Sequence, residues 1–186
     1  MSSRKASMSL LALLFGLLAP LVACGGPNSP GGKPALGTEP GDPPIGTKTE
    51  AKSILDLYPS LLAGSKYVYL SVDQNGKVSK STRVEAEVLE ATADKAKVRL
   101  TIAGANSSVV DIDRAKPPLL PPGGLTFEGR EQITVPAGSF NALKYSYSQG
   151  TSSFNTWAQR DVGILQTVEQ KGFDHVVTTT LQSYVH

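Results

Sequence analysis

The chain of 186 residues contains one cysteine, Cys24, and two histidines, His175 and His186. A single thiol cannot form a disulfide within the chain, and it excludes cysteine-rich zinc sites and iron–sulfur sites. His175 falls in the last predicted strand and His186 is the terminal residue, so neither favours a catalytic triad or a zinc site. We therefore expect no metal.

An excess of charge of one sign is also missing. The chain has 18 Lys+Arg and 16 Asp+Glu, and a net charge of +2 gives no reason to expect a nucleic-acid partner. The sequence has no Gly-x-Ser-x-Gly nucleophile elbow, no Walker loop and no dinucleotide fingerprint. These absences predict a protein that is not an enzyme and has no cofactor.

Residues 1–23 have the layout of a secretory signal peptide. Arg4 and Lys5 supply the positive charge, and the apolar stretch Met8–Leu21 follows. This stretch is shorter than the roughly 20 residues that cross a bilayer as a helix. It ends in Leu21-Val22-Ala23-Cys24, which resembles the lipobox of bacterial lipoproteins.

This resemblance implies that Cys24 carries acyl chains such as palmitate and anchors the protein in a membrane. Two or three acyl chains are enough for stable anchoring. Gly25 replaces the Asp that retains such proteins at the inner membrane in enteric-type bacteria. The resemblance therefore implies the outer membrane or the cell surface rather than the inner membrane.

The residues that follow differ in composition from the rest of the chain. Residues 25–52 contain seven Gly and six Pro. Such a segment buries too little apolar surface to offset its ordering entropy, so we expect residues 24–52 to form a flexible tether. A single domain is expected over 53–186.

The domain is predicted to be mostly β. Residues 53–58 can form one short helix before the first strand, and alternating apolar and polar residues dominate after it. Strands are expected at 67–72, 83–88, 95–102, 107–112, 125–128, 131–135, 140–148, 154–159, 164–170 and 174–185. We expect a single antiparallel curved sheet or barrel of eight to ten strands.

Turn signals predict how some of these strands pair. A two-residue turn at Asn75-Gly76 would place Tyr67 opposite Val84. In the next pair of strands, the register that joins the two apolar faces places Glu87 near Arg99.

A second resemblance rests on three short motifs. These are Ala63–Tyr69 (AGSKYVY), Val135–Ala142 (VPAGSFNA), and Trp157 followed by Val162–Leu165 (VGIL). Together they resemble motifs of uncharacterised β-rich bacterial envelope proteins that are similar to lipoprotein carriers. The resemblance implies a curved antiparallel sheet around an apolar cleft.

Three aromatic residues are candidates for lining such a cleft. Tyr145 and Tyr147 share a face with Leu143, and Trp157 could stack on a sugar or a lipid. Packing inside the domain is the alternative for each of them.

Acidic residues at predicted strand ends are the other candidate site. Asp111 and Asp113 lie two apart, Glu128 and Glu131 lie three apart, and Asp161 lies in a turn. Their spacing matches no calcium-binding motif and does not predict a glycosidase pair. A solvated strand end is the alternative.

The sequence therefore predicts a lipid-anchored envelope protein with a non-catalytic binding or assembly module. Its partner would be the membrane through Cys24, together with a lipid or another apolar ligand or an envelope protein. A purely structural lipoprotein and a hydrolase that uses strand-end carboxylates remain alternatives.

We predict that Cys24→Ser releases the protein from the membrane fraction, because this substitution removes the site of acylation. Cell fractionation followed by immunoblotting measures this. An unchanged membrane fraction would contradict the lipobox interpretation.

Overall fold

A computed structural model of the chain describes residues 37–49, 62–113 and 124–186, and all of its elements are β-strands. They are β1 (Lys48–Thr49), β2 (Lys66–Asn75), β3 (Val78–Ala91), β4 (Lys95–Ile102), β5 (Ser108–Asp113), β6 (Leu125–Val135), β7 (Gly138–Gln149), β8 (Ser152–Gln159), β9 (Gly163–Lys171) and β10 (His175–Val185). No helix occurs in these three ranges. The helix expected over 53–58 lies outside the described residues.

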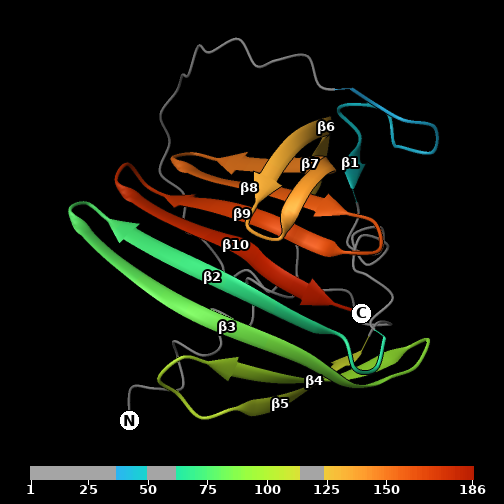
Figure 1. Cartoon of the computed structure of the whole chain (residues 1–186). Helices are drawn as coiled ribbons and strands as arrows, with labels where there is room; N and C mark the ends of the chain where they lie inside the picture. Colours follow the sequence, from blue (N-terminus) through green and yellow to red (C-terminus); the bar gives the residue numbers. More distant parts are fainter. Residues whose placement is uncertain (1–36, 50–61, 114–123) are drawn as a thin grey trace.

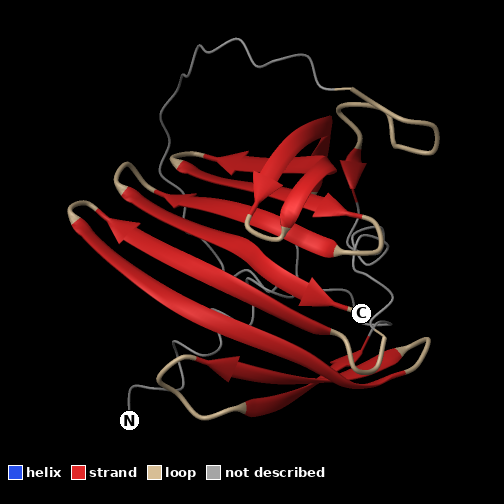
Figure 2. Cartoon of the chain, in the orientation of Figure 1, coloured by secondary structure: helices blue, strands red, loops and turns tan. Residues whose placement is uncertain are grey.

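The strands form one ten-stranded sheet in the order β1-β6-β7-β8-β9-β10-β2-β3-β4-β5 (Figures 1 and 2). Every neighbouring pair is antiparallel. This confirms the expected mostly β, single-sheet fold. The sequence allowed either a curved sheet or a barrel. The sheet does not close into a barrel, because its two end strands, β1 and β5, do not pair with each other in the described part of the chain.

Two meanders build the sheet. Strands β2 to β5 follow one another in space as they do in sequence, and so do β6 to β10. The last strand, β10, joins the two meanders by pairing with β2 along most of its length, from His175↔Asn75 to Val185↔Lys66. Residues 114–123, which link β5 to β6 and contain four prolines, lie outside the described residues.

Side chains alternate between a buried face and a half-exposed face. In β9 the side chains of Leu165, Thr167 and Glu169 are buried, whereas the residues between them are half-exposed. We call the side with Leu165 and Thr167 the inner face and the opposite side the outer face.

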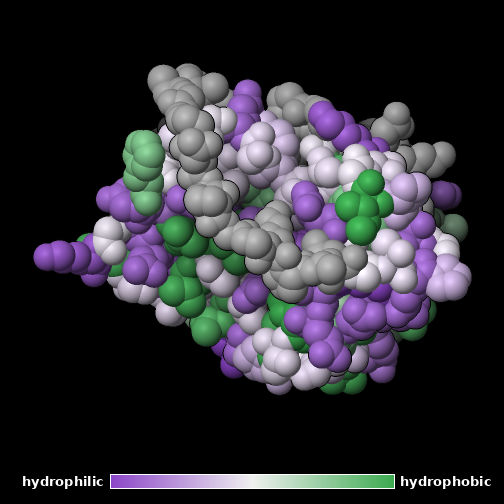
Figure 3. Space-filling view, turned by 90° about the horizontal axis from the view of Figure 1, so that it is seen from above, coloured by the Kyte–Doolittle hydropathy of each residue, from purple (hydrophilic) through white to green (hydrophobic). Residues whose placement is uncertain are grey.

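A large apolar cluster covers part of the inner face. Its buried members on β2, β3, β4, β9 and β10 are Tyr67, Tyr69, Val84, Ala86, Val88, Ala96, Val98, Leu100, Leu165 and Leu181. The tip of the β6–β7 hairpin also packs against this cluster through Ile133, Ala137 and Phe140. In the view from above, hydrophobic residues show as separate patches between hydrophilic ones (Figure 3).

The first hairpin differs from its predicted register by two residues. Tyr67 lies opposite Ala86, not Val84, and Asn75 pairs with Val78. The two turn residues are therefore Gly76 and Lys77. Gly76 has a φ of 56°, as the first central residue of a type II′ turn requires. Because the shift is an even number of residues, the predicted face of the tyrosines is retained.

The predicted pair of Glu87 and Arg99 is confirmed. The two residues lie opposite each other, and Arg99 Nη1 donates a hydrogen bond of 2.7 Å to Glu87 Oε2. Lys66 Nζ lies 3.1 Å from the other carboxylate oxygen. The hydrogen bonds from Lys66 and Arg99 lower the pKa of Glu87.

One pair of predicted strands is a single strand. Residues 125–128 and 131–135 were expected to be separate, but β6 runs through both ranges. The register against β7 shifts between Phe127 and Gly129, so Glu128 is an extra residue in the ladder. Gly129 has a φ of 108°, and glycine tolerates this conformation without steric cost. The bulge keeps the strand continuous.

We predict that Leu181→Ala lowers the free energy of unfolding by about 2–5 kcal/mol, because it leaves a cavity in the apolar cluster. The Leu181 side chain is 0% exposed, whereas Val185 on the same strand is 63% exposed. Urea unfolding followed by circular dichroism measures the loss. Val185→Ala is the control and should change stability by less than about 0.5 kcal/mol. Equal losses in the two variants would contradict the assigned burial.

Candidate functional site

Residues 37–49, which we call the strap, lie along the edge of β6. The backbone N–H of Arg130 donates to the carbonyl oxygen of Gly37 at 2.7 Å, and that of Phe127 donates to Thr47 at 2.9 Å. The strap ends in β1, which pairs with the first two residues of β6. These bonds cover a sheet edge that would otherwise expose unpaired backbone groups.

The strap belongs to the stretch that was expected to be a flexible tether, residues 24–52. Its composition is rich in Gly and Pro, but the structure places it on the sheet. The backbone bonds to β6 and one group of charged side chains hold it there, and both offset the ordering entropy that the sequence argument counted.

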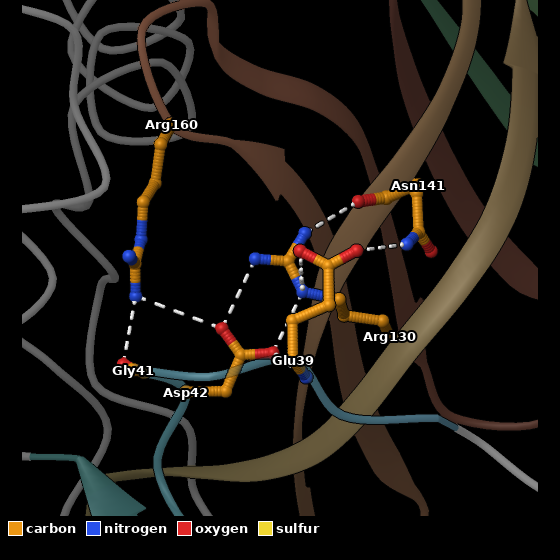
Figure 4. A network of polar contacts seen from close by, with 6 residues as sticks. All are labelled: Glu39, Gly41, Asp42, Arg130, Asn141 and Arg160. Carbon is orange, nitrogen blue, oxygen red and sulfur yellow. Dashed lines mark hydrogen bonds and ion pairs between the residues drawn. The ribbon is translucent and has the colours of Figure 1, made fainter.

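The charged group, which we call the clasp, centres on Asp42 (Figure 4). Arg130 donates from Nε to Oδ2 of Asp42 at 2.6 Å and from Nη2 to Oδ1 at 3.0 Å. Arg160 Nη2 lies 3.6 Å from Oδ1 of Asp42 and donates to the carbonyl oxygen of Gly41 at 3.0 Å. Glu39 lies 3.4 Å from Arg130 Nε and accepts a bond of 2.8 Å from Asn141 Nδ2. The clasp thus ties the strap to β6, to β7 and to the turn after β8.

The centre of the clasp, Asp42 with Arg130, is shielded from water, whereas the side chains of Glu39 and Arg160 are about half exposed. The side chain of Asp42 is 0% exposed and that of Arg130 is 9% exposed. The hydrogen bond from Arg130 lowers the pKa of the Asp42 carboxyl, against the opposing effect of burial. Asp42 is therefore ionised at neutral pH, as two-point pairing with an arginine requires.

A row of hydroxyl groups crosses the inner face of the sheet. Thr156, Thr167, Thr179 and Ser71 are register partners on the successive strands β8, β9, β10 and β2. All four are buried. We call these four residues the hydroxyl row. Each occupies a position where the alternation of the strand calls for an apolar side chain.

The hydroxyl row is only partly satisfied by hydrogen bonds. Thr179 Oγ1 donates to Ser71 Oγ at 3.1 Å. Thr156 Oγ1 and Thr167 Oγ1 have no hydrogen-bond partner among the described residues, although the two residues are only 6% and 1% exposed. A buried hydroxyl without a partner costs about 1–3 kcal/mol, so these two atoms need a physical explanation.

Tyr145 extends the row by one strand. It lies opposite Thr156 and Phe127, and its ring centroid is 5.3 Å from that of Phe127. Burial, and next the nearby Asp42 carboxylate, raise the pKa of Tyr145 to about 12. Tyr147 lies farther along the same face, is half-buried, and donates from its hydroxyl to Gln149 Oε1.

Tyr145 and Tyr147 belong to a second apolar cluster, whereas Trp157 packs against the large one. Trp157 is opposite Lys144, whose Nζ lies 5.0 Å from the centre of its ring. Trp157 Nε1 donates to Glu131 Oε2 at 3.0 Å, and Lys144 Nζ donates to the same oxygen at 2.7 Å. The three aromatic residues that the sequence singled out therefore do not line one surface. That any of them binds a ligand stays a prediction.

The acidic candidates lie in separate parts of the fold. Asp111 and Asp113 are on β5, where Asp111 lies opposite Lys97. Asp161 is in the turn between β8 and β9 with a φ of 73°. Glu128 and Glu131 are on β6, and Glu131 pairs with Lys144. The structure does not bring the strand-end acids of β5 together with those of the β8–β9 turn.

The remaining sequence predictions concern the lipid anchor, metal ions and membrane-spanning helices. Cys24 and the lipobox lie outside the described residues. Within 37–49, 62–113 and 124–186 there is no group of three or more side chains placed to hold a metal ion. In the same ranges no helix is long and apolar enough to span a bilayer.

Sequence analysis missed both the clasp and the hydroxyl row, although each left a signal. Glu39-Pro40-Gly41-Asp42 has the pattern of a type II turn, and Gly41 has the positive φ of 91° that this turn needs. A turn inside a supposed tether is a sign of local order. The signal for the hydroxyl row is that Thr167 and Thr179 each lie two residues from a leucine, Leu165 and Leu181, and so occupy the apolar face of their strands.

Comparison with known proteins gives little further information. No family model and no curated protein matches the chain. One similar solved structure is a presumed exported protein with a YmcC-like fold from Bacteroides fragilis NCTC 9343. It has a TM-score of 0.47 at 11% identity, over 69% of this chain and 98% of that chain. Another is a presumed lipoprotein from Parabacteroides distasonis ATCC 8503, with a TM-score of 0.49 at 12% identity over the same shares.

At these scores neither similarity carries an argument about this chain. The resemblance of the sequence to lipoprotein-carrier-like envelope proteins therefore stays a prediction.

We predict that Asp42→Asn releases the strap, because it removes the charge that pairs with Arg130. We expect a loss of about 1.5–3 kcal/mol in the free energy of unfolding and faster proteolytic cleavage within 37–49. Limited proteolysis with mass spectrometry locates the cuts. Asp94→Asn, at an exposed position, is the control and should leave the cleavage pattern unchanged.

The pH dependence of stability gives a second test of Asp42→Asn. The pKa of Asp42 is lower in the folded chain than its ordinary value of 3.8, so its stabilising effect is complete above that value. The effect is lost as the pH falls through the lowered pKa. Wild-type protein should lose this contribution in acid, whereas Asp42→Asn should lack it at every pH. Parallel stability curves for the two proteins below pH 4 would contradict the role of Asp42.

Proposed function

We propose that this chain is a lipid-anchored protein of the cell envelope, and that its sheet is a non-catalytic binding module whose ligand lies on the inner face. The observation that carries the proposal is the pair of unpartnered hydroxyls, Thr156 Oγ1 and Thr167 Oγ1. A ligand with polar groups over these atoms would supply the hydrogen bonds that the protein itself does not.

The apolar cluster supports this proposal. Leu165 and Leu181 lie two residues along their strands from Thr167 and Thr179 and are fully buried. Binding sites for small ligands are mostly apolar surfaces with a few placed polar groups, and this face has that composition.

The strap supports an anchored position close to a membrane. If Cys24 carries the lipid, twelve residues separate it from Gly37, where the strap begins on β6. These residues reach at most about 45 Å when fully extended. The β6 edge would then stay near the bilayer, where apolar ligands are available. Gly25 after the lipidated residue favours the outer membrane or the cell surface.

The arrangement of the charged side chains supports a non-catalytic role. Glu131 is bonded to Lys144 and Trp157, and Asp42 is bonded to Arg130. The hydrogen bond from Arg130 lowers the pKa of Asp42, and a carboxyl group with a lowered pKa is a poor proton donor or acceptor near neutral pH. These paired carboxylates are poorly suited to acid–base catalysis, and this favours a binding role.

Native mass spectrometry of the full chain, purified from a bacterial envelope, tests the proposal. We expect a non-covalent mass in the range of a lipid, which extraction and fragmentation would identify, in addition to any acyl groups on Cys24. Chain that stays bare, and that takes up nothing from an added lipid panel, would overturn the binding role. The purely structural envelope lipoprotein would then be the better description.

A further inference from the structure

Two hairpin tips lie side by side at one end of the sheet, and each carries an exposed apolar side chain (Figure 1). His175 on β10 pairs with Asn75 on β2, and Asn75 pairs with Val78, the first residue of β3. The backbone N–H of Gly76 donates to the carbonyl oxygen of Asp174 at 2.9 Å, so the turn after β2 is bonded to the turn after β9. The two turns therefore form one surface.

Phe173 and Val78 are the apolar residues of this surface, and we call them the tip pair. Phe173 is 89% exposed and Val78 is 70% exposed, which are the two largest values among the exposed large hydrophobic side chains of the described residues. Single exposed apolar side chains are common, but here the two most exposed ones lie on turns that are bonded to each other. Their grouping indicates a contact that the isolated chain does not make.

The tip pair is too small for a stable protein interface. A large aromatic side chain buries about 150–250 Å² and a valine buries less, whereas a specific protein interface needs about 800 Å² on each partner. A projecting turn with two apolar side chains instead suits a lipid surface, which needs no complementary shape. A contact of this size is sufficient as a second attachment beside a lipid anchor.

The charged side chains around the tip pair balance. Three lysines and three acids lie on the two turns and at the strand ends next to them: Lys77, Lys80, Lys171, Asp73, Glu169 and Asp174. Lys171 Nζ lies 3.2 Å from Glu169 Oε2, and His175 Nε2 lies 3.0 Å from Asp73 Oδ1. No excess of positive charge attracts anionic head groups, so the contact depends on the apolar side chains.

The lipid anchor proposed for Cys24 can reach the same bilayer. Gly37, where the strap begins, lies level with Arg130 on β6, and the strand registers carry this level across β7 and β8 to Ile164 on β9. Phe173 lies four strand spacings from the strap and nine residues beyond Ile164, which is about 36 Å in a flat sheet. The residues between Cys24 and Gly37 span up to about 45 Å. The anchor and the tip pair can therefore enter one membrane.

We propose that the turns after β2 and β9 dock on the surface of a lipid bilayer, with Phe173 and Val78 inserted among the head groups and the upper acyl chains. This inference rests on the proposed function, since the lipid anchor brings the sheet to the membrane. The second contact orients the sheet, whereas a lipid on Cys24 alone leaves it free to turn.

Fluorescence quenching by brominated lipid tests this contact. The full chain with its anchor is reconstituted into vesicles of zwitterionic phosphatidylcholine, with or without bromine on the acyl chains. Bromine quenches an indole that reaches the acyl region. In Phe173→Trp and in Val78→Trp we expect bromine to remove most of the added fluorescence, and we expect vesicles to shift its emission maximum to shorter wavelength. Wild-type protein, whose single tryptophan is Trp157, gives the baseline that is subtracted.

Val109→Trp is the matched control, because Val109 is an exposed valine at the other end of the sheet. It is 55% exposed, and its row across β4 and β3 reaches Lys66 on β2, nine residues from Asn75. Bromine should leave its added fluorescence unchanged. Since all three substituted positions are exposed, each variant should melt at the temperature of the wild type, as circular dichroism measures.

The outcomes separate this inference from the proposed function. Chain that floats with the vesicles, but in which Phe173→Trp is quenched no more than Val109→Trp, would overturn the inference and leave the anchor intact. A wavelength shift that occurs without vesicles and grows with protein concentration would overturn it in favour of a second copy of the chain at the tips. Chain that does not float with the vesicles would overturn both the inference and the lipid anchor.

Discussion

The pairing of β10 with β2 is the interaction on which the sheet depends. These strands lie at opposite ends of the described domain in sequence, and they join two meanders that are otherwise separate. The contact buries Leu181 against Tyr69 and places Thr179 beside Ser71. Without it, each meander would expose a long strand edge and its own part of the apolar cluster.

This pairing also determines the position of the hydroxyl row. Thr179 and Ser71 meet only because β10 returns between β9 and β2, and the register of β9 then brings Thr167 beside Thr179. A shift of one residue in either pair would turn these hydroxyls to the outer face. The site thus depends on long-range register, not on any local motif.

The opposite end of the sheet depends on the strap. A two-residue strand has little stability of its own, and the clasp of Asp42 with Arg130 supplies a second contact between the strap and β6. Both residues are shielded from water, so the loss of one partner would leave a buried charge unpaired. The clasp therefore connects the order of the strap to the ionisation of one carboxyl group.

The inner face combines features that reduce the stability of the free protein with features that suit a ligand. Among the described residues, Thr156 and Thr167 bury hydroxyls without partners, whereas the positions in phase two residues away are Ala158 in β8 and Leu165 in β9, both buried. Local departures of this kind from the best packing are typical of binding surfaces. Trp157, by contrast, is fully engaged by Lys144 and Glu131 and acts in joining strands β6, β7 and β8.

The amino-acid sequence by itself determined the strand content, the alternation of faces and the pairing of Glu87 with Arg99, because these depend on residues close in the chain. It also contains Leu21-Val22-Ala23-Cys24, which resembles a lipobox. Only the tertiary structure decided that the sheet stays open, that Asp42 meets Arg130, and that Tyr145 and Trp157 pack in different apolar clusters. These outcomes depend on contacts between residues distant in sequence, and a local pattern does not specify which distant strand or charge becomes the neighbour.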